Sequence, residues 1–339
     1  MELSAIITDW YTHNKRDLPW RNTHDAYRIW VSEIILQQTR VAQGVSYYKR
    51  FIERFPTIQD LANASLTEVL RLWQGLGYYS RARNMHKAAQ QCQGPFPTRY
   101  HDLLQLPGIG DYTAAAISSF ATDECHATVD GNVYRVLARW FDIDTAIDTT
   151  AGTRLFKQLA NEIIDPAHPG LHNQAMMEFG ARQCTPTQPD CANCPARDGC
   201  LALANDTVNE RPVKQGKTRQ RTRHLYYLDI HCGDHLFLHQ RNESDIWQGL
   251  YEMPLIEQEA EPDSTQLDNL LRGTGYALGC WSGEIKHILS HQVLRVKFLP
   301  IEVERANAYL EEFDCIASSR LDDYPLSRLT LKYLENKKG

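Results

Sequence analysis

Four cysteines in a short segment constrain the fold of this chain more than any other feature. They lie at Cys184, Cys191, Cys194 and Cys200, with the spacing C-x6-C-x2-C-x5-C. Four thiolates so close in sequence can surround one compact metal centre. Structural zinc usually takes two C-x2-C pairs and this segment has one, so the spacing favours a [4Fe–4S] cluster over zinc. Four free thiols would be a redox liability, which makes a metal-free segment the poorer interpretation.

A second feature is the glycine-containing turn Leu106–Gly110, which is followed by a helical pattern from Asp111. Gly108 and Gly110 let the backbone approach another molecule closely, and the helix presents its unpaired N–H groups at the same place. This arrangement predicts a phosphate-binding site. The alternative is an ordinary corner between two helices, which the turn alone does not exclude.

Two carboxylates are candidates for acid–base chemistry. Glu33 lies among apolar residues on a predicted helix, where helical spacing puts Gln37 on the same face. Desolvation there would raise its pKa and prepare it to donate a proton, although a solvated helix edge fits the spacing equally well. Asp130 precedes a helical pattern, so it is expected to cap that helix and to stay ionised there. One protonated and one charged carboxyl group is the pair that breaks glycosidic bonds.

The segment Gly75–Arg83 combines glycines, aromatic residues and arginines. Rings on a glycine-containing turn can stack on or wedge between bases while arginines contact phosphates. A helix corner with buried tyrosines is the alternative, and the segment alone does not decide between them.

Periodicity predicts two domains. Residues 1–208 read as consecutive helices, residues 209–223 as a polar, basic linker, and residues 224–339 as a small α+β domain with short strands. The acidic net charge of −6 lies in the C-terminal third, since residues 1–223 hold 25 Lys and Arg against 23 Asp and Glu. Residues 1–223 can therefore present a locally basic face. No apolar run reaches membrane-spanning length and no signal-peptide pattern opens the chain, so a cytoplasmic protein is expected.

Three local expectations are specific enough to test. A single helical stripe contains Tyr27, Trp30, Ile34, Val41, Val45 and Tyr48. Pro300 is expected to break a strand over 293–299, and Pro325 to start the closing helix.

These motifs together resemble the helix–hairpin–helix DNA glycosylases of the endonuclease III superfamily that carry an iron–sulfur cluster. The segments LPWR (18–21), WVSEIILQQTR (30–40), GLGYYSRARN (75–84), VDGN (129–132) and NQAMME (173–178) resemble the adenine DNA glycosylases of the MutY kind. The resemblance implies a mainly α N-terminal part of the helix–hairpin–helix glycosylase fold, followed by a Nudix-like domain. Relatives that also cleave the DNA strand carry a lysine at the position of Tyr112. Tyrosine cannot form their imine intermediate, so a monofunctional enzyme is expected.

The resemblance also implies a substrate and residue roles. The substrate would be duplex DNA with adenine opposite 8-oxoguanine or guanine, bound by a monomer that flips the adenine out of the helix. Glu33 would protonate the adenine, Asp130 would stabilise the sugar cation, and Tyr112 and Asn132 would orient both carboxylates. The residues implied to contact DNA are Arg21, Gln37, Gln38, Thr39, Leu76, Tyr78, Gly108, Gly110, Gln174, Ser290 and His291.

The C-terminal domain resembles a Nudix-like domain that recognises 8-oxoguanine. Residues 247–254, WQGLYEMP, fit its early signature, but the catalytic R-E-x-x-E-E core is missing, so this domain is expected to hydrolyse nothing. Leu289 stands where the family usually has an aromatic residue before Ser290 and His291. Two rival interpretations remain: a bifunctional or thymine-mismatch glycosylase, which Tyr112 disfavours, and a non-catalytic DNA binder, which the two carboxylates disfavour.

Overall fold

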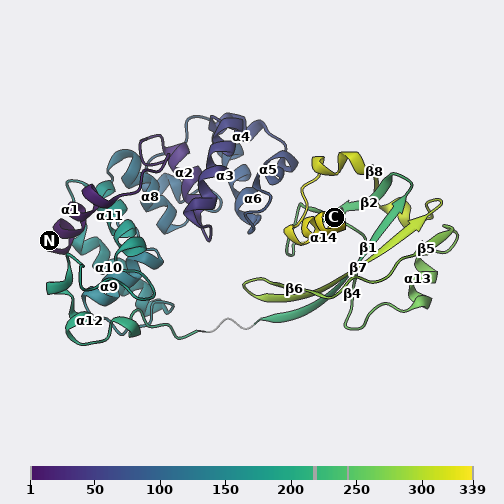
Figure 1. The fold of residues 1–339 in the computed structure, drawn as a ribbon. Coiled ribbons are helices and arrows are strands. Elements are labelled where there is room, and N and C mark those ends of the chain that lie inside the picture. Colours follow the sequence, from purple (N-terminus) through teal and green to yellow (C-terminus); the bar gives the residue numbers. More distant parts are fainter. Residues whose placement is uncertain (1, 217–219, 243, 338–339) are drawn as a thin grey trace. The chain divides into compact units, whose positions relative to one another are not determined.

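The chain forms two units, one helical and one built around a β-sheet (Figure 1). The computed structural model describes residues 2–216, 220–242 and 244–337. The first unit holds residues 1–63 and 84–216, and the second holds residues 64–83 and 217–339. The second unit thus includes an internal segment that the sequence did not separate from the helical part. None of the described helices is long and apolar enough to cross a membrane.

The first unit is helical, as the sequence predicted. Its main helices are α1 (Glu2–Asn14), α2 (Ala26–Leu36), α3 (Val41–Arg54), α4 (Ile58–Asn63), most of α6 (Ser80–Gln91), α7 (Tyr100–Leu103), α8 (Asp111–Thr122), α9 (Gly131–Trp140), α10 (Thr150–Ile163), α11 (Pro169–Arg182) and α12 (Leu201–Ala204). Short 3-10 turns lie at Arg197–Gly199 and Val208–Glu210.

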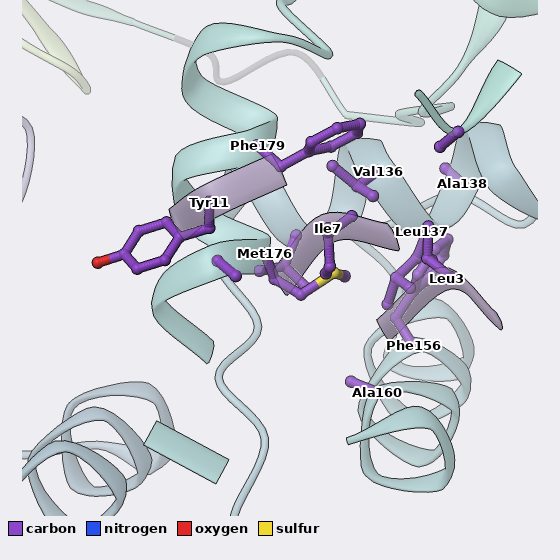
Figure 2. Packing of buried hydrophobic residues seen from close by; sticks show 13 residues of the cluster. Leu3, Ile7, Tyr11, Val136, Leu137, Ala138, Phe156, Ala160, Met176 and Phe179 are labelled. Atoms are coloured by element: carbon purple, nitrogen blue, oxygen red, sulfur yellow. The ribbon is translucent and has the colours of Figure 1, made fainter. Parts of the chain in front are cut away.

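One apolar core joins four helices of this unit. Figure 2 shows Leu3 and Ile7 of α1 among side chains of α9, α10 and α11, such as Phe156 and Met176. Val136 and Leu137 of α9 belong to the same core because they lie one turn from Val133 on one helix face. This packing fixes the start of α9 against α11.

The apolar residues from Tyr27 to Tyr48 do not lie on one helix, contrary to the prediction from the sequence. α2 ends at Leu36 and α3 begins at Val41, with Gln38 at a φ of +56° between them. The spacing continued by coincidence across this break. The break leaves residues 37–40 outside any helix.

The second unit contains α5 (Leu66–Trp73) and an eight-stranded sheet. Its elements after α5 are β1 (Arg221–Cys232), β2 (His235–Gln240), β3 (Tyr251–Glu252), β4 (Leu255–Glu257), α13 (Ser264–Leu270), β5 (Tyr276–Leu278), β6 (Ile285–Ile288), β7 (Gln292–Val303), β8 (Asp314–Ala317) and α14 (Arg328–Lys337), with 3-10 turns at Leu310–Glu312 and Ser318–Asp323. The central pair, β1 and β7, is parallel, and the other pairs are antiparallel.

Apolar side chains line both faces of this sheet. Leu225 and Tyr227 of β1 pack in a core with Leu329 of α14, whereas Leu228 and Ile230 pack in a second core with the residues of α13. Alternate residues of a strand point to opposite faces, so one strand serves both cores. The part of this unit that follows residue 220 is therefore α+β, as the sequence predicted.

Three sequence expectations for this unit need correction. β7 runs through Pro300, whose carbonyl accepts a hydrogen bond from the Gly279 N–H at 2.8 Å, so the missing N–H costs one ladder bond and not the strand. The last helix begins at Arg328 rather than at Pro325, because the Pro325 carbonyl accepts from the Tyr251 N–H at 2.8 Å. The expected linker overlaps β1 by three residues, since Arg221 already pairs with Gln292; residues 217–219 of that linker lie outside the described residues.

Candidate active site and cysteine cluster

A cavity of about 450 Å³ in the first unit brings together the residues expected to carry chemistry. Glu33, Tyr112, Asp130 and Asn132 all line it, although they come from α2, α8 and the beginning of α9. α2 packs on α8, and α11 packs on both α8 and α9, which explains how residues distant in sequence meet. We call it the Glu33 cavity.

Glu33 is a buried acid, with 8% of its surface exposed. Burial raises its pKa to about 7, and the nearby Asp130 adds to the rise, while a hydrogen bond from Tyr112 and the charge of Arg21 oppose it. The Tyr112 hydroxyl donates to Oε2 of Glu33 over 2.8 Å, and burial raises the pKa of this phenol well above its usual value. Of the two interpretations of Glu33, the structure supports the desolvated acid. Such a group is part protonated at neutral pH and can donate a proton.

Asp130 caps α9 and also faces the cavity. Its Oδ1 accepts from the backbone N–H groups of Asn132 and Val133, both at 2.9 Å, and its Oδ2 accepts from Nδ2 of Asn132 at 2.8 Å. Burial raises the pKa of Asp130, and these hydrogen bonds and Arg135 lower it. The helix end alone would keep Asp130 ionised, and burial opposes that effect.

Asn132 is held in place by Arg135 and by the close approach of α11. Arg135 donates to Oδ1 of Asn132 at 2.9 Å and, through Nε, to the Cys184 carbonyl at 2.7 Å. Gly180 of α11 lies so close that a Cβ there would stand 2.7 Å from the Asn132 Cβ. Glycine therefore permits the close approach of α11 to this end of α9.

One residue of this site, Glu178, was not predicted from the sequence, whereas Gln174 was. Glu178 accepts hydrogen bonds from Arg16 and Arg21, with its Oε2 at 2.6 Å from each guanidinium, and it lies within the wall of the Glu33 cavity. The two arginines overcome the effect of burial and lower the pKa of Glu178 to about 2. Gln174, one helical turn before Glu178, accepts from the Tyr11 hydroxyl at 2.8 Å. That four-residue spacing on one helix face was the signal available in the sequence.

The glycine turn has the geometry that the sequence implied, for one of its two glycines. Gly108 has a φ of +78°, and a Cβ there would stand 2.7 Å from the Asn84 Cβ. Both the backbone conformation and the lack of space therefore exclude a side chain at this position. Gly110 caps α8 with an ordinary extended backbone and open space around it. In the described part of the chain no N-cap side chain bonds the first N–H groups of α8, so they can meet an anion.

The turn after α2 forms another part of the cavity wall. Gln37, Gln38 and Thr39 all line the Glu33 cavity, and Gln38 is exposed with a left-handed backbone. Gln37 is the C-cap of α2, four residues after Glu33, and both residues line the same cavity.

In the second unit the structure joins two of the expected DNA-contacting residues. The hydroxyl groups of Tyr78 and Ser290 lie 2.6 Å apart, and Tyr78 is 51% exposed. His291 is exposed in the turn between β6 and β7, where Leu289 and Gln292 pair. Leu76 is 8% exposed, so Tyr78 rather than Leu76 presents an apolar side chain on this surface. One cavity of about 560 Å³ is lined by Leu76, Tyr78, Ser290 and His291.

The four clustered cysteines converge on one place in the first unit. Cys184, Cys191, Cys194 and Cys200 line a single cavity, together with apolar side chains such as Trp140 and Phe179. Burial and the neighbouring three thiols raise the pKa of Cys194 to about 11, and Arg139 donates to Sγ of Cys184 at 3.4 Å. In the described residues these thiols do not form a group that could hold a single metal ion. Four Cys thiols around one cavity are the ligand set that a [4Fe–4S] cluster takes.

Comparisons with known proteins agree with this geometry. Residues 31–162 match the family model described as HhH-GPD superfamily base excision DNA repair protein, and residues 226–336 match that of a NUDIX domain. A solved thermostable thymine-DNA glycosylase shares 26% identity and a TM-score of 0.56, over 60% of this chain and 95% of that chain. An endonuclease III solved with DNA has a TM-score of 0.52 at 22% identity, which shows the fold alone.

Curated relatives match over more of the chain. The adenine DNA glycosylase of Arabidopsis thaliana is 37% identical over 78% of this chain and 49% of the relative, and that of Mus musculus is 46% identical over 58% and 41%. This chain thus spans about half the length of these two relatives or less. The adenine DNA glycosylase of Buchnera aphidicola subsp. Baizongia pistaciae is 34% identical over 89% of this chain and 87% of its own length. The chain therefore belongs to the adenine DNA glycosylase family.

Proposed function

We propose that the protein is a base-excision glycosylase that hydrolyses the N-glycosidic bond of adenine mispaired with 8-oxoguanine or guanine in duplex DNA. The observation that carries this proposal is the pair of unlike carboxyl groups in the Glu33 cavity. Glu33 has a pKa of about 7 and donates a proton, whereas Asp130 accepts three hydrogen bonds that favour its anion and oppose the rise in pKa caused by burial. This is the division of labour that glycosidic cleavage requires.

Each residue then has a defined task. Glu33 protonates the flipped adenine, so that the leaving group departs as a neutral base. The Asp130 carboxylate stabilises the positive charge that develops on the sugar, and a water molecule completes the hydrolysis. Asn132 and Tyr112 orient the two acids through their hydrogen bonds at 2.8 Å. The turn at Gly108 and the first N–H groups of α8 hold a backbone phosphate.

The same cavity supports a monofunctional reaction. Its lining residues, all in the described part of the chain, include two arginines but no lysine. Covalent catalysis by imine formation needs an amine nucleophile, and the phenol of Tyr112 is engaged with Glu33. Borohydride treatment during turnover should therefore trap no protein–DNA adduct. A stable amine-linked adduct would refute this part of the proposal.

A [4Fe–4S] cluster held by Cys184, Cys191, Cys194 and Cys200 is part of the proposal. Bound there, it would brace the loop after α11 whose Cys184 carbonyl receives Arg135. The purified protein should be brown, with the broad visible absorption of such clusters. Stoichiometric zinc in a colourless protein would show that the assignment is wrong.

The second unit is proposed to read the base opposite the adenine through Tyr78 and Ser290. Its test is a comparison of duplexes carrying 8-oxoguanine or guanine opposite adenine, with wild type and Ser290→Ala. Loss of the preference for 8-oxoguanine with intact cleavage of adenine opposite guanine is expected.

The decisive experiment measures base release from duplexes that differ at one base pair. Adenine opposite 8-oxoguanine should give alkali-labile abasic sites, adenine opposite thymine should not, and a thymine mispair distinguishes the thymine-mismatch alternative. Glu33→Gln should lower the activity by about 10²–10⁴-fold. Equal rates of base release for wild type and Glu33→Gln would refute the catalytic role of Glu33 and favour a non-catalytic DNA binder.

A further inference from the structure

A second cavity, of about 470 Å³, adjoins the Glu33 cavity within the first unit. We call it the rear cavity. Four residues line both cavities: Arg16, Arg21, Phe120 and Gln174. Their side chains therefore form the partition between the two spaces. Beyond it, the rear cavity is lined by exposed polar residues, including Asn22, His24 and His168, so it opens to solvent.

The members of the partition differ in how firmly they are held. Arg16 and Arg21 are fixed by charge-assisted hydrogen bonds to the buried Glu178, and Arg21 also donates to the Arg16 carbonyl at 2.9 Å. The Gln174 side chain is held by a neutral hydrogen bond from the Tyr11 hydroxyl. A neutral bond is roughly half as strong as a charge-assisted one. Of these three hydrogen-bonded side chains, Gln174 is thus the one that can move aside most easily.

We propose that the rear cavity is the route by which the free purine base leaves the enzyme. This inference rests on the proposed function. A flipped base enters the Glu33 cavity from the DNA side, and after hydrolysis the abasic strand still covers that entrance. The released base is small and uncharged. The Gln174 amide can hydrogen-bond its edge and the Phe120 ring can contact its face as it passes the partition.

The route explains an otherwise unused feature of the site. A cavity that served only to hold the flipped base would need one opening, on the DNA side. Here four residues that line the Glu33 cavity also form the wall of a second, solvent-exposed space. Base departure through the rear cavity lets the enzyme keep its abasic product bound, which shields a reactive site from side reactions.

The test separates bond cleavage from base departure. Leu171 of α11 is 36% exposed and lines the rear cavity, and Leu171→Trp should fill part of it. Leu155→Trp on α10 is the matched control, since Leu155 is 39% exposed and is absent from the described lining of both cavities. A duplex with radiolabelled adenine opposite 8-oxoguanine is cleaved under single-turnover conditions. Abasic sites are counted after alkali, and free adenine is counted in the filtrate of a membrane that retains the complex.

In wild type and Leu155→Trp, free adenine should appear as fast as abasic sites. In Leu171→Trp, abasic sites should form at the wild-type rate while free adenine lags by about tenfold, because product release becomes slow. Equal release in Leu171→Trp and wild type would overturn the proposal. Asn22→Trp, which fills the rear cavity from another wall, repeats the test if Leu171→Trp fails to fold. Absence of abasic sites in wild type would instead contradict the proposed function itself.

Discussion

The Tyr112 hydroxyl donates a hydrogen bond to Oε2 of Glu33 over 2.8 Å inside the Glu33 cavity. This bond favours the charged form of an acid that burial drives toward its neutral form. The balance places the pKa of Glu33 at about 7, where both forms are populated. Tyr112 therefore sets the pH range of the proposed reaction as well as excluding imine chemistry.

Tyr112→Phe should shift the pH dependence of cleavage upward. Loss of the hydrogen bond raises the pKa of Glu33 further, because only burial and the charge of Asp130 remain as strong effects. If protonated Glu33 is the active form, activity declines as pH rises through this pKa, so the alkaline limb should move to higher pH. Single-turnover rates between pH 5 and pH 9 measure the shift, a range of about two units either side of neutrality.

The control for Tyr112→Phe is Tyr100→Phe. Tyr100 also donates to a carboxylate, Asp111, at 2.8 Å, but neither residue lines the Glu33 cavity in the described structure. The control should leave the alkaline limb in place. An unmoved limb in Tyr112→Phe would show that the hydrogen bond does not tune Glu33.

Glu33→Gln should lower activity and raise stability at alkaline pH. Proton transfer by a positioned acid contributes about 10²–10⁴-fold to the rate, so a loss of that order is expected. Because the folded-state pKa of about 7 lies above the usual value of 4.5, Glu33 contributes stability at low pH that is lost as pH rises through 7. At pH 8 the variant should gain about 2 kcal/mol in the free energy of unfolding.

Urea unfolding at pH 5 and pH 8 checks this second effect. The gain of Glu33→Gln over wild type should be larger at the higher pH, where wild type must bury a charge. The same difference at both pH values would mean that Glu33 titrates alike in the folded and unfolded states.

Asp130→Asn should separate capping from catalysis. Asparagine caps helices as well as aspartate does, and its Oδ1 can accept from the N–H groups of Asn132 and Val133. Stability should therefore change by less than about 1 kcal/mol. Cleavage should fall by several orders of magnitude, because the neutral amide cannot stabilise a sugar cation. Asp130→Ala should lose both, and cleavage by Asp130→Asn near the wild-type rate would leave Asp130 as a cap alone.

Local sequence patterns predicted most of the site because each key residue sits in a distinctive segment. Asp130 precedes a helical pattern, Gly108 follows a proline in a tight turn, and the cysteines are close in sequence. Arg135 and Glu178 were missed because their partners lie 49 and 162 residues away, and no local pattern encodes such contacts. The extended β7 was underestimated since Pro300 removes a single donor, and only the sheet shows that this donor is dispensable.

Glu178→Ala should destabilise the fold and loosen the partition of the Glu33 cavity. The Glu178 side chain is fully buried, and its removal leaves Arg16 and Arg21 without their shared anion. Breaking a buried pair typically costs 3–5 kcal/mol; Arg16 is 35% exposed, so about 3 kcal/mol is expected. In wild type the lowered pKa of about 2 means that this stability persists above pH 4.5 and is lost as pH falls toward 2.

Thermal and urea unfolding of Glu178→Ala and Glu178→Asp measure these effects. Glu178→Asp keeps the charge and should recover part of the stability, although its shorter side chain cannot reach both guanidinium groups equally well. A pH-independent loss in Glu178→Ala would show that packing, rather than the ion pairs, makes Glu178 important.

Gly180→Ala should impair cleavage without touching a reacting group. An added Cβ would stand 2.7 Å from the Asn132 Cβ and 2.8 Å from its carbonyl oxygen, both closer than side chains tolerate. α11 or the start of α9 must therefore shift, and Asn132 would lose its 2.8 Å contact with Asp130. A displacement of this size can cost about 100-fold in rate. Gly131→Ala is the matched control, because nothing lies within 4 Å of a Cβ there. Single-turnover rates and unfolding curves should show the larger loss in Gly180→Ala, and equal rates in the two variants would contradict the positioning role of this contact.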